Sequence, residues 1–251
     1  MKIIKLGGGR RLGVCARAME EWTKGVRLPR ERLLLLPIPT TRDGKIVFGT
    51  ECSLEELLAL ADSTLMVAGY GIPKDVAQRL EHHGAGVYDA ALDEDFLIEN
   101  AKITAHGALG RILTETDRDI SELSIGVVGY GRIGSALAEL LMFLGSDVRI
   151  FSGSEEKIIA LVSAGANVSA MDGSDFSDLD ILINTAPRRI LSPDQEVELL
   201  RSGVRIIELA SGKNFSSDEV NVMASIPDKM YPVSSGRLYA KYILRSLSGK
   251  A

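Results

Sequence analysis

The chain has 251 residues, of which 45% are hydrophobic and 25% charged, and its formal net charge is −5. This length allows one large domain or two modest ones, and the composition is that of an ordinary soluble α/β protein. The acidic net charge argues against binding to DNA or RNA. Residues 1–32 nevertheless carry nine Lys and Arg against three Glu. This local excess indicates either a solvated helix face or an attraction for an anionic ligand.

The N-terminus, "MKIIKLGGGRR", lacks the apolar region of a signal peptide, and no stretch approaches the length of a membrane span. The two cysteines, Cys15 and Cys52, have neither metal-site nor disulfide spacing. We therefore expect a cytoplasmic protein without metal, in which Cys15 belongs to the core.

Strands and helices alternate along the chain, which predicts parallel sheets with helices on their faces. The predicted strands cover residues 2–6, 33–38, 64–68, 87–89, 124–128, 147–151, 167–169, 181–184 and 205–209, with 229–231 as a weaker candidate. The predicted helices include 54–61, 74–83, 104–117, 155–164 and 238–247.

This order of elements predicts an α/β fold with two domains joined by interdomain helices. Residues 104–236 would form a Rossmann domain with a doubly wound parallel sheet. Residues 1–103 and 237–251 would form a smaller, flavodoxin-like α/β domain.

The stretch "GVVGYGRIGSALAELL" (126–141) follows a predicted buried strand and opens a predicted helix that stops at Gly145. Gly129 allows a tight turn, Gly131 lets the backbone approach a pyrophosphate, and Gly134 lets the helix pack close to the strand. The N–H groups at the helix start would receive the phosphates. We therefore expect a dinucleotide site formed by Gly129, Tyr130, Gly131, Arg132, Ile133 and Gly134.

The next strand ends in "IFSGSEEK". An NAD site usually has an acidic residue here, about 20 residues past the fingerprint, but this chain has Ser152 and Gly153. The later acids, Glu155 and Glu156, are typical of a first helical turn behind a serine N-cap. Ser152 and Ser154 could bond a 2′-phosphate, with charge from Lys157, Arg132 or Arg149. We therefore favour NADP over NAD.

Two further strand ends would lie near the nicotinamide. The first is "DILINTAP" (180–187) and the second is "IIELASG" (206–212). Both could instead be simple turns with capping polar groups. We assign to the cofactor site Asn184, Thr185, Ala186, Pro187, Ala210 and Ser211.

With these pieces, the chain resembles the family of bacterial dipicolinate synthase A chains, which is related to the D-isomer 2-hydroxyacid dehydrogenases. The resemblance rests on "LLLLPIPTTRDG" (33–44), "VAGYGIP" (67–73), "NAKITAHG" (100–107), "DILINTAP" and "ELAS", and on Gly7, Gly8 and Arg11 of the first turn. It implies pyridine-nucleotide-dependent oxidation of a reduced dipicolinate precursor to dipicolinate for the spore core. It also implies that the partner is a flavoprotein-like B subunit, and we expect a homodimer.

The chain departs from the family pattern at several positions. Gly9 stands in place of an aspartate, Ile103 in place of a proline and His106 in place of a glutamate. The first domain is about one βα unit short, because the strand at Leu33 begins soon after the first helix.

Hydride transfer to a nicotinamide requires a clamp for the substrate carboxylate and a proton acceptor. Arg11 could bind a carboxylate in a bidentate pair, or be a solvated arginine at a helix start. His106 falls at the predicted start of helix 104–117, where a neutral imidazole would be favoured as a base. Lys213 could supply the positive charge of an arginine at the substrate. The expected substrate contacts are Thr40, Thr41, Gly69, Tyr70, Gly71 and Thr104. The stretch Gly69-Tyr70-Gly71 could offer its backbone N–H groups to the substrate or be merely a tight turn.

Two other functions remain open. A non-catalytic NAD(P)-binding subunit or sensor is compatible with the shortened first domain. A divergent D-2-hydroxyacid dehydrogenase is less favoured, because no histidine follows His106 and Lys213 cannot replace the fork of an arginine. The remaining histidines, His82 and His83, stand at the end of the predicted helix 74–83, and we expect them to cap it.

Overall fold

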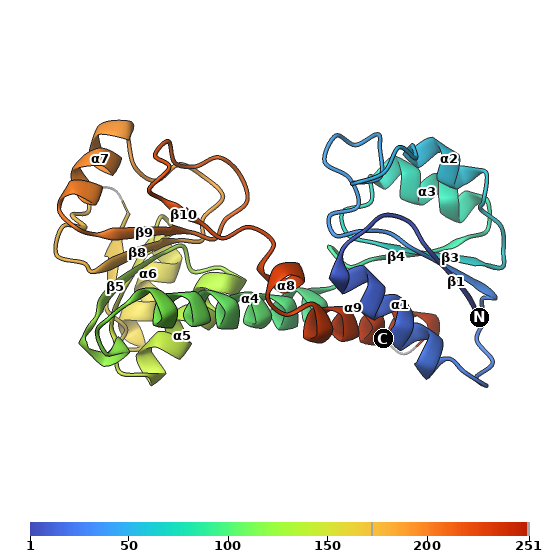
Figure 1. Ribbon diagram of the computed structural model, residues 1–251, viewed down its shortest axis with the longest axis horizontal. Coiled ribbons are helices and arrows are strands. Elements are labelled where there is room, and N and C mark those ends of the chain that lie inside the picture. The colour runs from blue at the N-terminus through green and yellow to red at the C-terminus, as the bar shows by residue number, and fades with distance from the viewer. Residues whose placement is uncertain (172, 250–251) are drawn as a thin grey trace. The chain divides into compact units, whose positions relative to one another are not determined.

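The computed structural model describes residues 1–171 and 173–249. Contacts within the chain define a first unit, Met1–Asn100 with Pro227–Ala251, and a second unit, Ala101–Ile226 (Figure 1). Both divisions fall at helices, α4 (Glu94–Glu115) and α8 (Ile226–Lys229). Lys250 and Ala251, which we expected in the first domain, lie outside the described residues.

The second unit is built on a six-stranded parallel sheet with the order β10-β9-β8-β5-β6-β7. Its chain winds outward from β5 in both directions, which confirms the doubly wound Rossmann fold. The strand order reverses between β5 and β8, and ligands of such sheets bind at the carboxyl ends of the strands beside this point. The strands are β5 (Ser124–Val128), β6 (Asp147–Ser152), β7 (Val168–Ala170), β8 (Ile181–Asn184), β9 (Arg205–Glu208) and β10 (Asn221–Val222).

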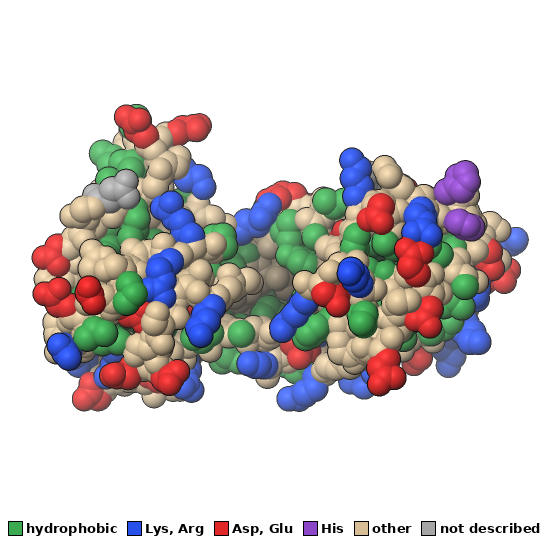
Figure 2. Space-filling view, turned by 90° about the horizontal axis from the view of Figure 1, so that it is seen from above, with side chains coloured by type: hydrophobic (Ala, Val, Ile, Leu, Met, Phe, Trp, Pro, Cys, Tyr) green, Lys and Arg blue, Asp and Glu red, His purple; other side chains and the backbone are tan. Residues whose placement is uncertain are grey.

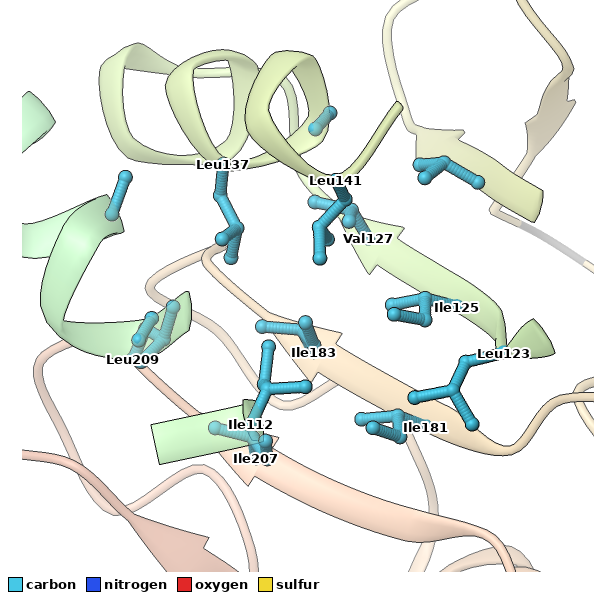
Figure 3. Packing of buried hydrophobic residues seen from close by; sticks show 14 of the residues in the cluster. Ile112, Leu123, Ile125, Val127, Leu137, Leu141, Ile181, Ile183, Ile207 and Leu209 are labelled. Carbon is cyan, nitrogen blue, oxygen red and sulfur yellow. The ribbon is translucent and has the colours of Figure 1, made fainter. Parts of the chain in front are cut away.

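Successive side chains of these strands point to opposite faces of the sheet, so a hydrophobic core forms on each face. Ile181 and Ile183 belong to one cluster, which the end of α4 and α5 (Arg132–Phe143) complete (Figure 3). Leu182 belongs to a cluster on the other face, with Phe151 and Phe176. The remaining helices of this unit are the 3₁₀ turn η1 (Ile120–Glu122), α6 (Glu155–Ser163) and α7 (Pro193–Arg201).

The first unit contains a four-stranded parallel sheet with the order β1-β2-β3-β4. One face carries α2 and α3, whose Leu57 and Val76 pack against Leu34 and Val67 of the sheet. The other face carries α1 and α9, which pack along each other (Figure 1). The strands are β1 (Lys2–Lys5), β2 (Arg32–Leu35), β3 (Leu65–Gly69) and β4 (Gly86–Asp89), and the helices are α1 (Arg10–Trp22), α2 (Leu54–Leu58), α3 (Lys74–His82) and α9 (Pro232–Leu247).

The position of α1 in the first unit is unusual for four parallel strands in chain order. Right-handed crossovers would place every connecting helix on one face of such a sheet. Instead, α1 lies on the face opposite α2 and α3. The connections would be right-handed if the chain formed one more strand between α1 and β2, and if that strand lay at the edge of the sheet beside β1. The sheet would then have the strand order of flavodoxin. The unit therefore has the arrangement of a flavodoxin-like sheet without its second strand.

The structure corrects three predicted elements. Residues 229–231 form no strand, because Lys229 ends the short helix α8. The helix expected over 104–117 begins at Glu94, where two acidic residues occupy its first turn. The two-residue strand β10 was not predicted, because so short an edge strand has no periodic pattern.

Candidate functional site

The glycine-rich turn lies at the carboxyl end of β5, and each glycine has its own steric reason. Gly129 has a positive φ of 90°. A Cβ atom added at Gly134 would overlap the carbonyl oxygen of Gly129 and lie 2.8 Å from Oγ1 of Thr185. A Cβ atom added at Gly131 would meet nothing within 4 Å, and no side chain caps the start of α5 there. An uncapped helix start beside open space is what a pyrophosphate requires, so this turn fits the cofactor.

The other fingerprint residues support this turn. Arg132 and Ile133 form the first turn of α5, and Ile133 and Tyr130 pack against the core cluster. The Tyr130 carbonyl accepts a hydrogen bond from Nζ of Lys157 at 3.0 Å. This contact joins the turn to the start of α6.

The loop after β8 is tied to the glycine turn by a side chain. The hydroxyl of Thr185 donates to the carbonyl of Val128 at 2.9 Å. Asn184, which is fully buried, accepts from the N–H of Ala186 at 3.0 Å and donates back to the Ala186 carbonyl at 3.0 Å. Pro187 follows as an exposed residue. The loop therefore has a fixed conformation beside the strand reversal.

Glu208, at the end of β9, is a buried carboxylate that the sequence analysis did not single out. It is 1% exposed, accepts from Nδ2 of Asn184 at 3.0 Å and accepts from the Ala210 N–H at 2.6 Å. Burial raises the pKa of this carboxyl group, and the contact with Asn184 opposes that shift. The signal that could have revealed it is an acid at the end of the apolar strand "RIIE".

The end of β6 carries Ser152 and Gly153, and not a carboxylate, at the position where NAD-binding Rossmann sheets have an acidic residue. Ser152 is buried, and its hydroxyl accepts from the Ser154 N–H at 3.1 Å. Ser154 caps α6, with Glu155 and Glu156 in the first turn behind it, as the sequence predicts. Arg149 is held by Asp178 at 2.7 Å, so its charge is already matched.

The loop after β9 is held by a second buried acid. Glu196 of α7 is 1% exposed and accepts from the N–H groups of Ser216 and Ser217. Ser211 and Lys213 are exposed within this loop. Ala210 is half-buried beside Glu208.

Arg11 of the first unit is a buried cation rather than a solvated one. It is 6% exposed, and its Nη2 donates to Oδ1 of Asn100 at 2.9 Å. Its guanidinium carbon lies 5.7 Å from the centre of the Phe96 ring. Burial lowers the pKa of Arg11 to about 10, and within the described residues its Nε has no hydrogen-bond partner. A buried guanidinium with a spare donor is suited to an anionic group.

The turn before α1 lacks its own carboxylate but receives one from α8. A Cβ atom added at Gly9 would lie 3.2 Å from Oδ1 of Asp228, and this oxygen accepts from the Arg11 N–H at 2.9 Å. Asp228 therefore supplies a carboxylate beside position 9, where the chain itself has a glycine.

The polar groups after β2 and β3 bind each other. Thr40 is fully buried, and its hydroxyl accepts from the Tyr70 N–H at 2.8 Å. The Gly71 N–H donates to Asp89 at 2.7 Å. The Thr41 hydroxyl bonds Asp43 within its own loop. The N–H groups of Tyr70 and Gly71, expected to approach a substrate next to Gly69, are thus engaged within the chain.

The histidines occupy different environments. His106 is exposed and lies well inside α4, so the expectation that it begins a helix is wrong, as is the argument for a neutral ring that rested on it. Thr104, two residues earlier, is buried. His82 and His83 are exposed at the end of α3, and Figure 2 shows histidine side chains at the surface of the first unit. Nδ1 of His83 lies 2.7 Å from the Arg79 carbonyl, which agrees with capping.

Cys15 is fully buried, and burial raises the pKa of its thiol to about 12, so it is a core residue as expected. Over the part of the chain that the structure describes, His, Cys, Asp and Glu do not gather into a metal-binding group. No helix within that part is long and apolar enough to cross a membrane.

Comparisons with known proteins agree with this geometry. Residues 124–230 match the family described as NADP oxidoreductase, coenzyme F420-dependent. No curated protein matches the chain.

Among solved structures, the dipicolinate synthase A chain from Bacillus halodurans is 19% identical, with a TM-score of 0.77 over 98% of this chain and 97% of that one. The corresponding protein from Bacillus subtilis is 18% identical, with a TM-score of 0.76 over 100% and 96%. The NAD complex of a D-isomer specific 2-hydroxyacid dehydrogenase from Lactobacillus delbrueckii ssp. bulgaricus is 13% identical, with a TM-score of 0.55 over 99% and 96%. The chain therefore has the two-domain fold of the dipicolinate synthase A chains, a fold like that of NAD(P)-dependent oxidoreductases.

Proposed function

We propose that the chain is an NADP(H)-dependent oxidoreductase that oxidises a reduced cyclic dicarboxylate, the precursor of dipicolinate. One observation carries the proposal. The carboxyl edge of the second unit combines an uncapped helix start at Gly131 with a ribose end, Ser152 and Gly153, that has no carboxylate. NADP is favoured over NAD because a carboxylate that would repel a 2′-phosphate is missing from that position.

The proposed reaction removes two hydrogen atoms from the ring of the substrate. When bound, the oxidised nicotinamide supplies the acceptor for a hydride from one ring carbon. A proton leaves the neighbouring ring atom for a base, and the remaining electron pair closes the aromatic ring. We assign the base to His106 and the binding of one substrate carboxylate to Arg11, with Lys213 supplying a further positive charge.

The environment of Arg11 supports this assignment. Its guanidinium is buried, its pKa is lowered by burial, and its Nε lacks a partner within the described residues. A substrate carboxylate would offer two oxygens to the planar guanidinium of Arg11. Its negative charge would offset the cost of burying the positive one.

A second candidate function is a non-catalytic NADP-binding subunit. It is favoured by the internal hydrogen bonds of Thr40, Tyr70 and Gly71, which leave fewer donors for a substrate. A flavoprotein-like B subunit is the proposed partner in either case. The dehydrogenase of D-2-hydroxy acids remains less favoured, because no histidine follows His106.

One experiment separates these functions. NADPH binding by the purified chain is measured calorimetrically, and oxidation of the reduced precursor is then followed by NADPH absorbance, with and without the flavoprotein partner. We expect NADPH to bind in the micromolar range and NADPH to form when the substrate is present. His106→Ala should lower the kcat of that reaction. Binding without turnover under both conditions would favour the non-catalytic subunit, and no binding would overturn the proposal.

A further inference from the structure

The guanidinium of Arg188 lies against the turn that ends β6, although Arg188 itself belongs to the loop after β8. A Cβ atom added at Gly153 would lie 2.8 Å from Nη2 of Arg188 and 3.7 Å from its central carbon. The absence of a side chain at Gly153 allows this close approach, because a Cβ atom there would push the end of the arginine aside. Arg188 is exposed, so the donors that do not face Gly153 are open to a ligand.

The end of the second Rossmann strand is the place where the 2′ position of the adenosine ribose is read. An aspartate or glutamate there binds the 2′-hydroxyl of NAD, and an arginine accommodates the 2′-phosphate of NADP. In this chain the strand offers Ser152 and Gly153, and the arginine arrives from another loop. The planar fork of a guanidinium matches two phosphate oxygens at once.

A chain of hydrogen bonds holds Arg188 in its place. Its backbone N–H donates to the Ala186 carbonyl at 2.8 Å. The Ala186 N–H in turn donates to Oδ1 of Asn184, which is itself bonded to Glu208. The backbone at Arg188 is therefore tied to the buried Asn184 and Glu208, so binding of a phosphate would not have to order this part of the loop.

The neighbouring cations are committed to other contacts. Arg149 is paired with Asp178. Arg189 bonds the Ser216 hydroxyl and lies 3.7 Å from Glu196. Lys157 reaches the Tyr130 carbonyl, on the side of the glycine turn. The three atoms nearest to a Cβ atom added at Gly153 all belong to the guanidinium of Arg188.

We propose that Arg188 binds the ribose 2′-phosphate and is the residue that makes the site prefer NADP(H) over NAD(H). This inference rests on the proposed nucleotide site and adds to it a specificity residue outside the fingerprint. It also explains why the sequence around β6 has two serines and a glycine but no basic residue at the ribose position.

The test compares Arg188→Ala, Arg188→Lys and the control Arg201→Ala, which removes an exposed arginine at the end of α7. Dissociation constants are measured calorimetrically for NADP⁺, NAD⁺, adenosine 2′,5′-bisphosphate and 5′-AMP. Loss of a charged hydrogen-bond donor should weaken NADP⁺ and the bisphosphate roughly ten- to a hundredfold in Arg188→Ala. Binding of NAD⁺ and 5′-AMP should stay within about twofold of the parent, while Arg188→Lys should recover part of the loss.

The outcomes distinguish this inference from the proposed function. If the parent binds both nucleotides and Arg188→Ala leaves the NADP⁺ to NAD⁺ ratio unchanged, the inference fails and the nucleotide site stands. If Arg188→Ala weakens all four ligands equally, Arg188 only supports the loop and the inference also fails. If the parent binds none of the four, the proposed function itself is wrong. The control variant should bind all four ligands as the parent does.

Discussion

Both units place a glycine-bearing turn between a parallel strand and a helix, but the two turns differ in what their N–H groups contact. In the second unit, the N-cap residue of α5 is Gly131, which provides no side-chain cap and lies beside open space. In the first unit, Asp228 accepts an N–H at the start of α1, and the N–H groups of Tyr70 and Gly71 bond Thr40 and Asp89.

The difference lies in which backbone donors the chain itself already uses, because a glycine turn can bind an anion only through N–H groups that are not engaged. In the first unit, Asp228, the Thr40 hydroxyl and Asp89 accept from the N–H groups of Arg11, Tyr70 and Gly71 respectively. The candidate anion-binding group of this unit is therefore a side chain, that of Arg11. In the second unit the backbone itself is available to a phosphate. Four predictions test the contrast, beginning with the largest effect.

Gly134→Ala should damage the second unit most. The added methyl group would overlap the Gly129 carbonyl and crowd Oγ1 of Thr185, so the backbone must shift. We expect a loss of about 3 kcal/mol in the free energy of unfolding, measured by urea denaturation. Gly131→Ala is the matched control, since its methyl group would enter open space. Equal stability of the two variants would contradict the steric role of Gly134.

Gly131→Val should abolish nucleotide binding while the unit stays folded. A Cβ atom at position 131 meets nothing within 4 Å in the protein, but a valine side chain would occupy the space that the pyrophosphate needs. Affinity for NADPH should fall by more than about tenfold in a fluorescence titration, with an unchanged urea midpoint. Unaltered affinity would show that the phosphates bind elsewhere.

Arg11→Ala should act on the first unit and on substrate binding. Arg11→Ala removes the hydrogen bond from Nη2 to Oδ1 of Asn100 and the packing of the buried side chain, which we expect to cost about 1–3 kcal/mol of stability. KM for the dicarboxylate should rise by about tenfold or more, with NADPH affinity unchanged. The exposed neighbour provides the control, Arg10→Ala, which should change neither quantity. A normal KM in a folded Arg11→Ala protein would remove Arg11 from substrate binding.

Glu208→Gln should give the smallest effect, a change in pH dependence. Burial raises the folded-state pKa of Glu208 above its ordinary value of 4.5, so the folded protein holds this proton to higher pH than the unfolded chain does. The stability that Glu208 contributes should therefore fall as the pH rises from 4.5 through the raised pKa. As the pH rises from 4.5 through the raised pKa, the unfolding free energy of the parent should fall relative to that of Glu208→Gln. A constant difference would show that Glu208 titrates normally.

The sequence was sufficient for most of the fold and for the glycine turn. Strand positions followed from apolar runs, and the N-cap at Ser154 followed from a serine before two acids, because these signals act over a few residues. The start of α4 was predicted at residue 104, but the helix begins at Glu94. A strand was predicted at residues 229–231, but Lys229 ends the helical turn α8. In both places the local residues allow more than one element, and packing selects between them.

The sequence by itself determined which strand ends carry polar residues and that the ribose position lacks an acid, since both are properties of neighbouring residues. Only the tertiary structure decided which groups meet. Glu208 reaches Asn184, Asp228 stands beside Gly9, and Arg188 faces Gly153 across loops that are far apart in the chain. The physical reason is that parallel strands gather their carboxyl ends at one edge of the sheet. Contacts between side chains there depend on the order and register of strands, which no local pattern encodes.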